Sequence, residues 1–180
     1  MTCRRATTPL DRLNEADRSV FVDLVGPLVE QAPWVAEAAF DVRPFETPDA
    51  LWRALFGIII TEPAPRKMAF LRGHPELGGH EARIRTMTDE STREQDALQL
   101  AALNSAEATR LADLNRRYRE HFGYPCVIAV RLHASLASLL DAFEARLNNP
   151  PDMELDLALD QVGEVIRGRI ETMFSQEFVA

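Results

Sequence analysis

The sequence predicts an all-α protein, a single-domain bundle of about seven to nine helices. Apolar residues recur at intervals of three and four along most of the 180-residue chain, which is the period of an amphipathic helix. Hydroxyl side chains and prolines stand where these stretches begin, and glycines or prolines stand where several of them end. The one strand-like run, CVIAV at 126–130, has no second run to pair with.

The N-terminal half is expected to contain an arm and four helices. Residues 1–12 are predicted to be irregular, and the domain proper is expected over 13–175. The first helix should end or kink at Pro27, because proline removes a backbone donor. The others are expected at PWVAEAAF (33–40), after the N-cap Thr47 with Pro48 in the first turn, and over 64–72.

The C-terminal half should begin with a loop and continue with helices. Residues 74–90 are polar and contain glycine, so most of this stretch should be loop. Ser91 and Glu94 fit a capping box at the start of the next helix. A long helix should be capped by Ser105 and stopped by Gly123. A buried segment at 126–130, extended or a short helix, should follow, and two last helices are expected over 135–149 and 152–174.

Composition excludes several classes of function. The net charge of −8 disfavours nucleic acid as a partner. No run reaches the roughly 18 apolar residues of a membrane helix, and the start of the chain does not resemble a signal peptide. Two cysteines, Cys3 and Cys126, are too few for a disulfide framework. We therefore expect a reduced, cytoplasmic protein that does not bind membranes.

Pattern alone does not identify a reaction. The four histidines, His74, His80, His121 and His133, lack the spacing of three or four that a zinc helix uses, so no metal site is expected. No nucleophile elbow, phosphate-binding loop or dinucleotide fingerprint is present. The unusual feature is His74, which precedes a proline just after a predicted helix end. Proline keeps the residue before it out of the α region, so His74 should project from the helix end.

Several motifs together resemble one family. HPELG (74–78) is similar to its HPDLAG signature, and STREQ (91–95) is similar to its S-x-x-E-Q segment. LNRRYREHFGYPCVIAVRL (114–132) resembles a third block, and PWVAEAAF and RGRI also match. The family is 2-oxo-4-hydroxy-4-carboxy-5-ureidoimidazoline (OHCU) decarboxylase. The resemblance implies an all-α fold, a homodimer, and conversion of OHCU to (S)-allantoin during urate degradation.

The resemblance also implies the site residues. His74, Glu94 and Arg169 are the expected catalytic residues. Substrate contacts are expected from a larger set: Pro75, Ser91, Thr92, Arg93, Gln95, Cys126, Val127, Ile128, Ala129 and Val130. No cofactor is expected, because the substrate has a ring imine beside the carbon that bears the carboxylate, and this imine can take up the electron pair.

One departure from the family leaves an alternative open. The family usually has small residues after its Glu-Gln pair, whereas this chain has Leu98 and Gln99. A non-catalytic or altered-specificity paralogue that binds a related ureide or purine-derived ligand is the alternative. Helical spacing favours Arg169 over Arg167 as the pocket arginine, because Arg169 shares a face with Val165, Ile166 and Met173.

Overall fold

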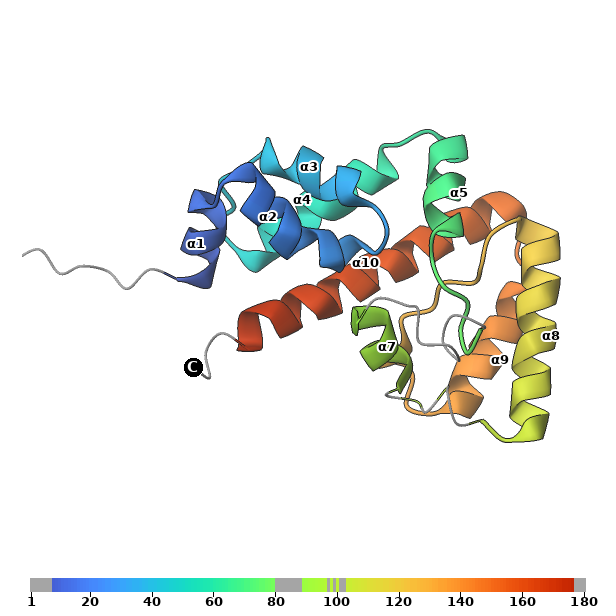
Figure 1. Cartoon of the computed structure of the whole chain (residues 1–180). Helices are drawn as coiled ribbons and strands as arrows, with labels where there is room; N and C mark the ends of the chain where they lie inside the picture. The colour runs from blue at the N-terminus through green and yellow to red at the C-terminus, as the bar shows by residue number, and fades with distance from the viewer. Residues whose placement is uncertain (1–7, 80–88, 97, 99, 101–102, 177–180) are drawn as a thin grey trace, which may run out of the picture.

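The computed structural model describes residues 8–79, 89–96, 98, 100 and 103–176 (Figure 1). These residues form nine α-helices and two short 3-10 helices, and they contain no strand. The all-α prediction is confirmed. The predictions for Cys3, His80 and Gln99 concern residues that lie outside the described part of the chain.

The N-terminal half begins with a helix where an arm was expected. Helix α1 starts at Pro9, so residues 9–12 are helical, and the prediction of an irregular arm is wrong there. The Thr8 side chain accepts from the backbone N–H of Asp11, and the Asp11 carboxylate accepts from that of Thr8. This reciprocal cap satisfies donors that a helix start leaves unpaired. The elements of this half are α1 (Pro9–Glu15), α2 (Arg18–Val25), η1 (Gly26–Val29), α3 (Pro33–Phe40), α4 (Pro48–Ile60) and α5 (Ala64–Arg72).

The C-terminal half keeps the predicted order of elements. Its long helix is capped by Asn104, one residue before the predicted Ser105, and Gly123 ends it in the left-handed conformation, with φ of 78°. The segment at 126–130 is extended and buried until it enters a 3-10 turn. The elements are α7 (Asp89–Asp96), α8 (Ser105–Phe122), η2 (Val130–Leu132), α9 (Leu136–Arg146) and α10 (Pro151–Gln176).

Helix α10 connects the two halves. It runs from α8 and α9 at one end of the molecule to α1 and α2 at the other (Figure 1). It packs on α4, α5 and η1. Contact with α4 is close at Gly163, where an added Cβ would lie 3.0 Å from the Phe56 ring, and the Trp52 indole donates to the Gly163 carbonyl at 2.8 Å. This packing fixes the rotation of α10, and therefore the face on which Arg169 lies. No helix in the described part is long and apolar enough to cross a membrane.

Candidate active site

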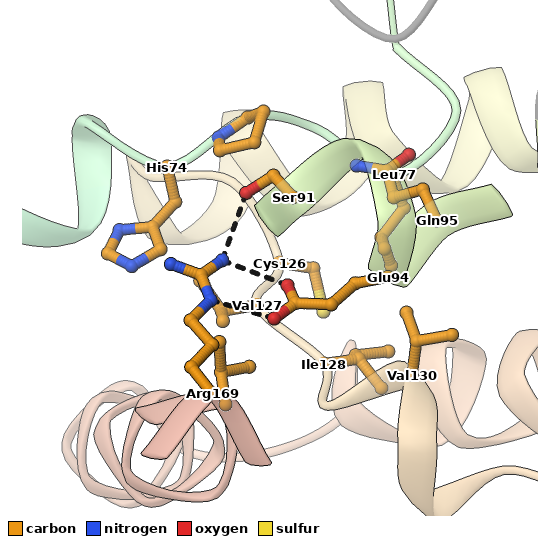
Figure 2. A pocket seen from close by; sticks show the side chains of 12 residues that line it. His74, Leu77, Ser91, Glu94, Gln95, Cys126, Val127, Ile128, Val130 and Arg169 are labelled. Carbon is orange, nitrogen blue, oxygen red and sulfur yellow. Dashed lines mark hydrogen bonds and ion pairs between the residues drawn. The ribbon is translucent and has the colours of Figure 1, made fainter. Parts of the chain in front are cut away.

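Four segments surround a small chamber of about 40 Å³ (Figure 2). They are the loop after α5, helix α7, the extended segment before η2, and α10. Ten of the lining residues were expected from the sequence: His74, Pro75, Ser91, Glu94, Gln95, Cys126, Val127, Ile128, Val130 and Arg169. Leu77 and Val165 complete the lining and were not foreseen.

His74 lies just beyond the end of α5, and its ring is held by that helix. Its Nδ1 lies 3.2 Å from the carbonyl oxygen of Phe70, and the Phe70 ring packs edge-on against the imidazole at a centroid distance of 4.8 Å. A carbonyl oxygen only accepts, so Nδ1 carries the hydrogen. In the neutral ring, Nε2 is therefore the nitrogen that can take up a proton.

The surroundings of His74 favour its neutral form. Burial lowers the pKa of His74 below its usual 6.5, and the positive charge of Arg169 acts in the same direction. The carboxylate of Glu30 and the Phe70 carbonyl oppose this shift, but the net change is downward. The ring is therefore set up as a proton acceptor near neutral pH. Glu30 is the carboxylate that raises this pKa.

The loop that carries His74 is braced from two helices. The Gly78 N–H donates to the Gln95 side-chain oxygen at 2.8 Å, and the Asn115 amide donates to the Leu77 carbonyl at 2.9 Å. Gly78 has φ of 55°, and an added Cβ would lie 2.7 Å from Leu111 Cδ2, so the position needs glycine. Gln95 was expected as a substrate contact, and the structure shows that its amide also holds this loop.

Arg169 is buried, and its guanidinium lies between His74 and Glu94 (Figure 2). Its Nε and Nη2 donate to the two carboxylate oxygens of Glu94 at 2.7 and 2.9 Å. This is the bidentate geometry with which arginine binds carboxylates. Burial alone would lower the pKa of Arg169, but Glu94 and Glu30 raise it, so the side chain stays cationic.

Ser91 does not cap a helix as expected. Helix α7 begins at Asp89, two residues earlier, so Ser91 lies within its first turn. The Ser91 hydroxyl donates to Glu30 Oε2 at 2.7 Å and accepts from Arg169 Nη2 at 3.1 Å. Glu30, directly after η1, and Arg169, on α10, therefore bind the hydroxyl that would have accepted from the backbone in a capping box.

Glu30 is the polar site residue that sequence reasoning missed. Its side chain is only 2% exposed, and its Oε2 lies 3.0 Å from Arg169 Nη1. The one available signal was an acid interrupting the apolar stretch from Leu28 to Ala32. That signal does not reveal a partner on α10, which is more than a hundred residues away in the chain.

The extended segment is held by side chains behind it. The Arg146 guanidinium donates to the Val127 carbonyl at 2.6 Å, and the Ala129 N–H donates to Gln161 Oε1 at 3.0 Å. The backbone N–H groups of Val127 and Ile128 have no partner within the described part of the chain. They are therefore available to a ligand. Burial raises the pKa of the Cys126 thiol to about 12, so it is not a thiolate nucleophile.

A larger cavity of about 520 Å³ adjoins the chamber. Glu94, Val130, Val165 and Arg169 line both spaces. Among the expected substrate contacts, Arg93 and Ala129 line only the larger cavity, and Thr92 lines neither.

The described residues contain no cluster of three or more His, Cys, Asp or Glu side chains that could hold a metal ion. The polar side chains at the chamber are one histidine, one arginine, two carboxylates, a hydroxyl and the Gln95 amide. This set can bind a carboxylate at Arg169 and move a proton at His74.

The chain is similar to known proteins along most of its length. The family model for OHCU decarboxylase matches residues 14–171. The chain is 36% identical over 159 residues to 2-oxo-4-hydroxy-4-carboxy-5-ureidoimidazoline decarboxylase of Mus musculus, covering 88% of this chain and 89% of the mouse protein.

Two crystal structures have a similar fold. One, of (S)-allantoin synthase, superposes with a TM-score of 0.73 at 25% identity and covers 92% of this chain. This chain spans about half of that protein, 53% of its length. The other, of an OHCU decarboxylase in the presence of (S)-allantoin, gives a TM-score of 0.64 at 17% identity, covering 89% of this chain and 99% of the other.

Proposed function

The chain belongs to the OHCU decarboxylase family, and on that premise we propose that it is a cofactor-independent carboxy-lyase that converts OHCU to (S)-allantoin in urate degradation. The observation that carries the proposal is the juxtaposition of His74 with the Arg169 guanidinium in one chamber (Figure 2). His74, Glu94 and Arg169 are the proposed catalytic residues.

The substrate carries its hydroxyl and its carboxylate on one ring carbon, beside a ring imine. When the bond to the carboxylate breaks, carbon dioxide leaves and the electron pair moves toward the imine nitrogen, which takes up a proton. The resulting enol loses its hydroxyl proton, and the carbon bearing the ureido group gains one. His74 is suited to accept the hydroxyl proton at Nε2 and to deliver a proton to one face of the ring, which would set the chirality.

The charged groups support a position for the substrate carboxylate. The Nε/Nη2 edge of Arg169 holds the Glu94 carboxylate in the geometry that a substrate carboxylate would use. Glu94 must then move aside. The N–H groups of Val127 and Ile128 can donate to oxygens of the ureido group or the ring.

The volumes support an entry through the larger cavity. A space of about 40 Å³ is far smaller than the roughly 300–1,000 Å³ of usual ligand pockets, so the chamber in this conformation is too small for the whole substrate. The adjoining 520 Å³ lies within the usual range of ligand pockets, roughly 300–1,000 Å³. Glu94 and Arg169 line the chamber and the larger cavity alike. Movement of Glu94 away from Arg169 would therefore join the two spaces.

The test is the chirality of the product from freshly prepared OHCU. The substrate also decays spontaneously to racemic allantoin, so optical activity distinguishes catalysis from decay. We expect (S)-allantoin to form in excess with the native protein and a racemate with His74→Ala. A racemic product at an unaccelerated rate with the native protein would refute the function.

The altered-specificity paralogue has weaker support. Leu98 is half-buried against the hydrophobic core and lines neither cavity, and Leu100 is buried in the core. The side chain of Leu98, which stands where the family usually has a small residue, is thus accommodated away from the chamber. A pocket altered by Leu98 is not favoured.

We propose a homodimer in the cytoplasm, on the basis of the family resemblance, with the catalytic domain spanning residues 13–175. The apolar side chains of Val20 and Leu24 on α2 are 48% and 47% exposed, which suits a contact between subunits. Light scattering coupled to size exclusion would measure the mass. A monomer at micromolar concentration would contradict the proposed dimer.

A further inference from the structure

Glu30 has an unusual backbone as well as a buried carboxylate. It is the only residue other than glycine with positive φ in the described part of the chain, at φ 53° and ψ −142°. A residue with a Cβ is strained in this region, and such strain persists where surrounding contacts enforce it. The Glu30 carbonyl accepts from the Ala32 N–H at 2.9 Å, which links the turn to the start of α3.

The Glu30 side chain holds one end of the Arg169 guanidinium. Arg169 Nη1 contacts Glu30 Oε2 at 3.0 Å and the Pro27 carbonyl at 3.1 Å. Pro27 lies in the η1 turn, and Glu30 is the residue directly after it. Ser91 donates to the same Oε2 at 2.7 Å, so a single oxygen connects η1, α7 and α10.

The opposite edge of the guanidinium has a more exposed partner. The Glu94 carboxylate accepts from Nε and Nη2. Its side chain is 31% exposed, compared with 2% for the side chain of Glu30. A carboxylate that is about a third exposed can leave its partner and be rehydrated, whereas a buried carboxylate would lose its partners without gaining water. The two carboxylates on Arg169 are therefore not equivalent, since Glu94 can be exchanged and Glu30 cannot.

We propose that Glu30 is a positioning residue: it anchors the Nη1 end of Arg169 so that the Nε/Nη2 edge stays aimed at the substrate carboxylate when Glu94 moves aside. This inference rests on the proposed decarboxylase function and adds a residue to it. Arg169 touches the substrate, and Glu30 acts through Arg169.

Two substitutions separate the reach of Glu30 from its charge. Glu30→Asp keeps the charge but withdraws the carboxylate by about one carbon–carbon bond, roughly 1.5 Å, so it cannot reach both Arg169 and Ser91. Glu30→Gln loses the charge but keeps an amide oxygen of the same reach, which can accept both bonds because both end on Oε2. If Glu30 works by anchoring, the aspartate variant is the more damaged of the two.

The readout compares a ligand that has the carboxylate with one that lacks it. For Glu30→Asp we expect the KM for OHCU to rise at least tenfold, with the inhibition constant of (S)-allantoin within threefold of the native value. For Glu30→Gln we expect a smaller rise in the KM for OHCU than for Glu30→Asp, because the amide oxygen keeps the reach to Arg169, with the inhibition constant of (S)-allantoin again within threefold of the native value. Glu120→Asp, at an exposed surface residue on α8, is the matched control and should change neither. Equal losses in the two Glu30 variants, a greater loss in Glu30→Gln, or parallel shifts for OHCU and allantoin would overturn the proposal.

A second measurement does not need turnover. The Nε–H resonance of Arg169, assigned by its absence in Arg169→Lys, should keep its shift in Glu30→Gln and move or broaden in Glu30→Asp. An unchanged resonance in Glu30→Asp would show that Glu30 does not anchor Arg169. If the native protein does not convert OHCU, the proposed function fails, while this spectrum still decides the anchoring.

Discussion

Arg169→Lys and Arg167→Lys test which face of α10 serves the chamber. The two residues are two positions apart, so on a helix they point about 200° away from each other. Arg169 is buried and contacts Glu94, Ser91, Glu30 and the Pro27 carbonyl. Arg167 lies with its guanidinium 3.8 Å from the Trp52 ring centroid and contacts Asp49 at 3.3 Å.

The size of the Arg169→Lys effect follows from its contacts. The guanidinium donates to both Glu94 oxygens, to Ser91 and to Pro27. Lysine keeps the charge but has three donors on one nitrogen, so it cannot reproduce the bidentate fork. Hydrogen bonds to charged groups contribute about 1.5–3 kcal/mol each. Loss of a single such hydrogen bond in the transition state lowers kcat/KM by about tenfold or more, since about 1.4 kcal/mol corresponds to a factor of ten.

The assay measures kcat/KM on fresh OHCU for both lysine variants under the same conditions. Arg167→Lys keeps the attraction to Asp49 and should leave kcat/KM within about twofold of the native value, with a stability loss on the order of 0.5–1 kcal/mol from the weaker contact with Trp52. Thermal unfolding shows whether each variant is folded. Equal losses of activity, or a greater loss for Arg167→Lys, would refute the assignment of Arg169 to the substrate.

Three further substitutions and a pH profile test other parts of the site. His74→Ala should lower kcat by about 10²–10⁴, and retention of more than about a tenth of the rate would remove its role as the principal acid-base group. Glu94→Gln should lower kcat less than His74→Ala, because its amide oxygen still accepts one of the two hydrogen bonds from Arg169; an equal loss of kcat would contradict this ranking. Because the pKa of His74 is lowered, kcat/KM should be level above pH 6.5 and fall only below it, and a fall beginning above pH 7 would contradict the neutral histidine. The stability contributed by neutral, buried His74 is likewise present above pH 6.5 and is lost on acidification, since the unfolded chain binds the proton more readily. Gly78→Ala should reduce the free energy of unfolding by about 1–3 kcal/mol in urea titrations, because its Cβ would meet Leu111 at 2.7 Å with φ at 55°; an unchanged midpoint would show that the loop relaxes.

Local signals in the sequence determined most helix boundaries. Pro33, the Thr47 cap and Gly123 each act on the backbone within a few residues, so they mark the same helix ends in the structure. The face of α10 that carries Arg169 could also be predicted, because a helix has a fixed period and its apolar residues mark the buried side. His74 was found from its neighbours, since Gly73 and Pro75 mark a helix end.

Only the tertiary structure decided what the polar side chains at the chamber do. Ser91 has the local pattern of a helix cap, yet its hydroxyl binds Glu30 and Arg169, which lie 61 and 78 positions away. Gln95 braces the loop at Gly78, 17 residues before it. The local signal at Glu30, an acid within an apolar stretch, does not reveal its role, because its buried charge is stable only when α10 brings a guanidinium to it. Hydrogen-bond and ion-pair partners depend on distance in space, and the packing of η1 on α10 sets the distance between Glu30 and Arg169.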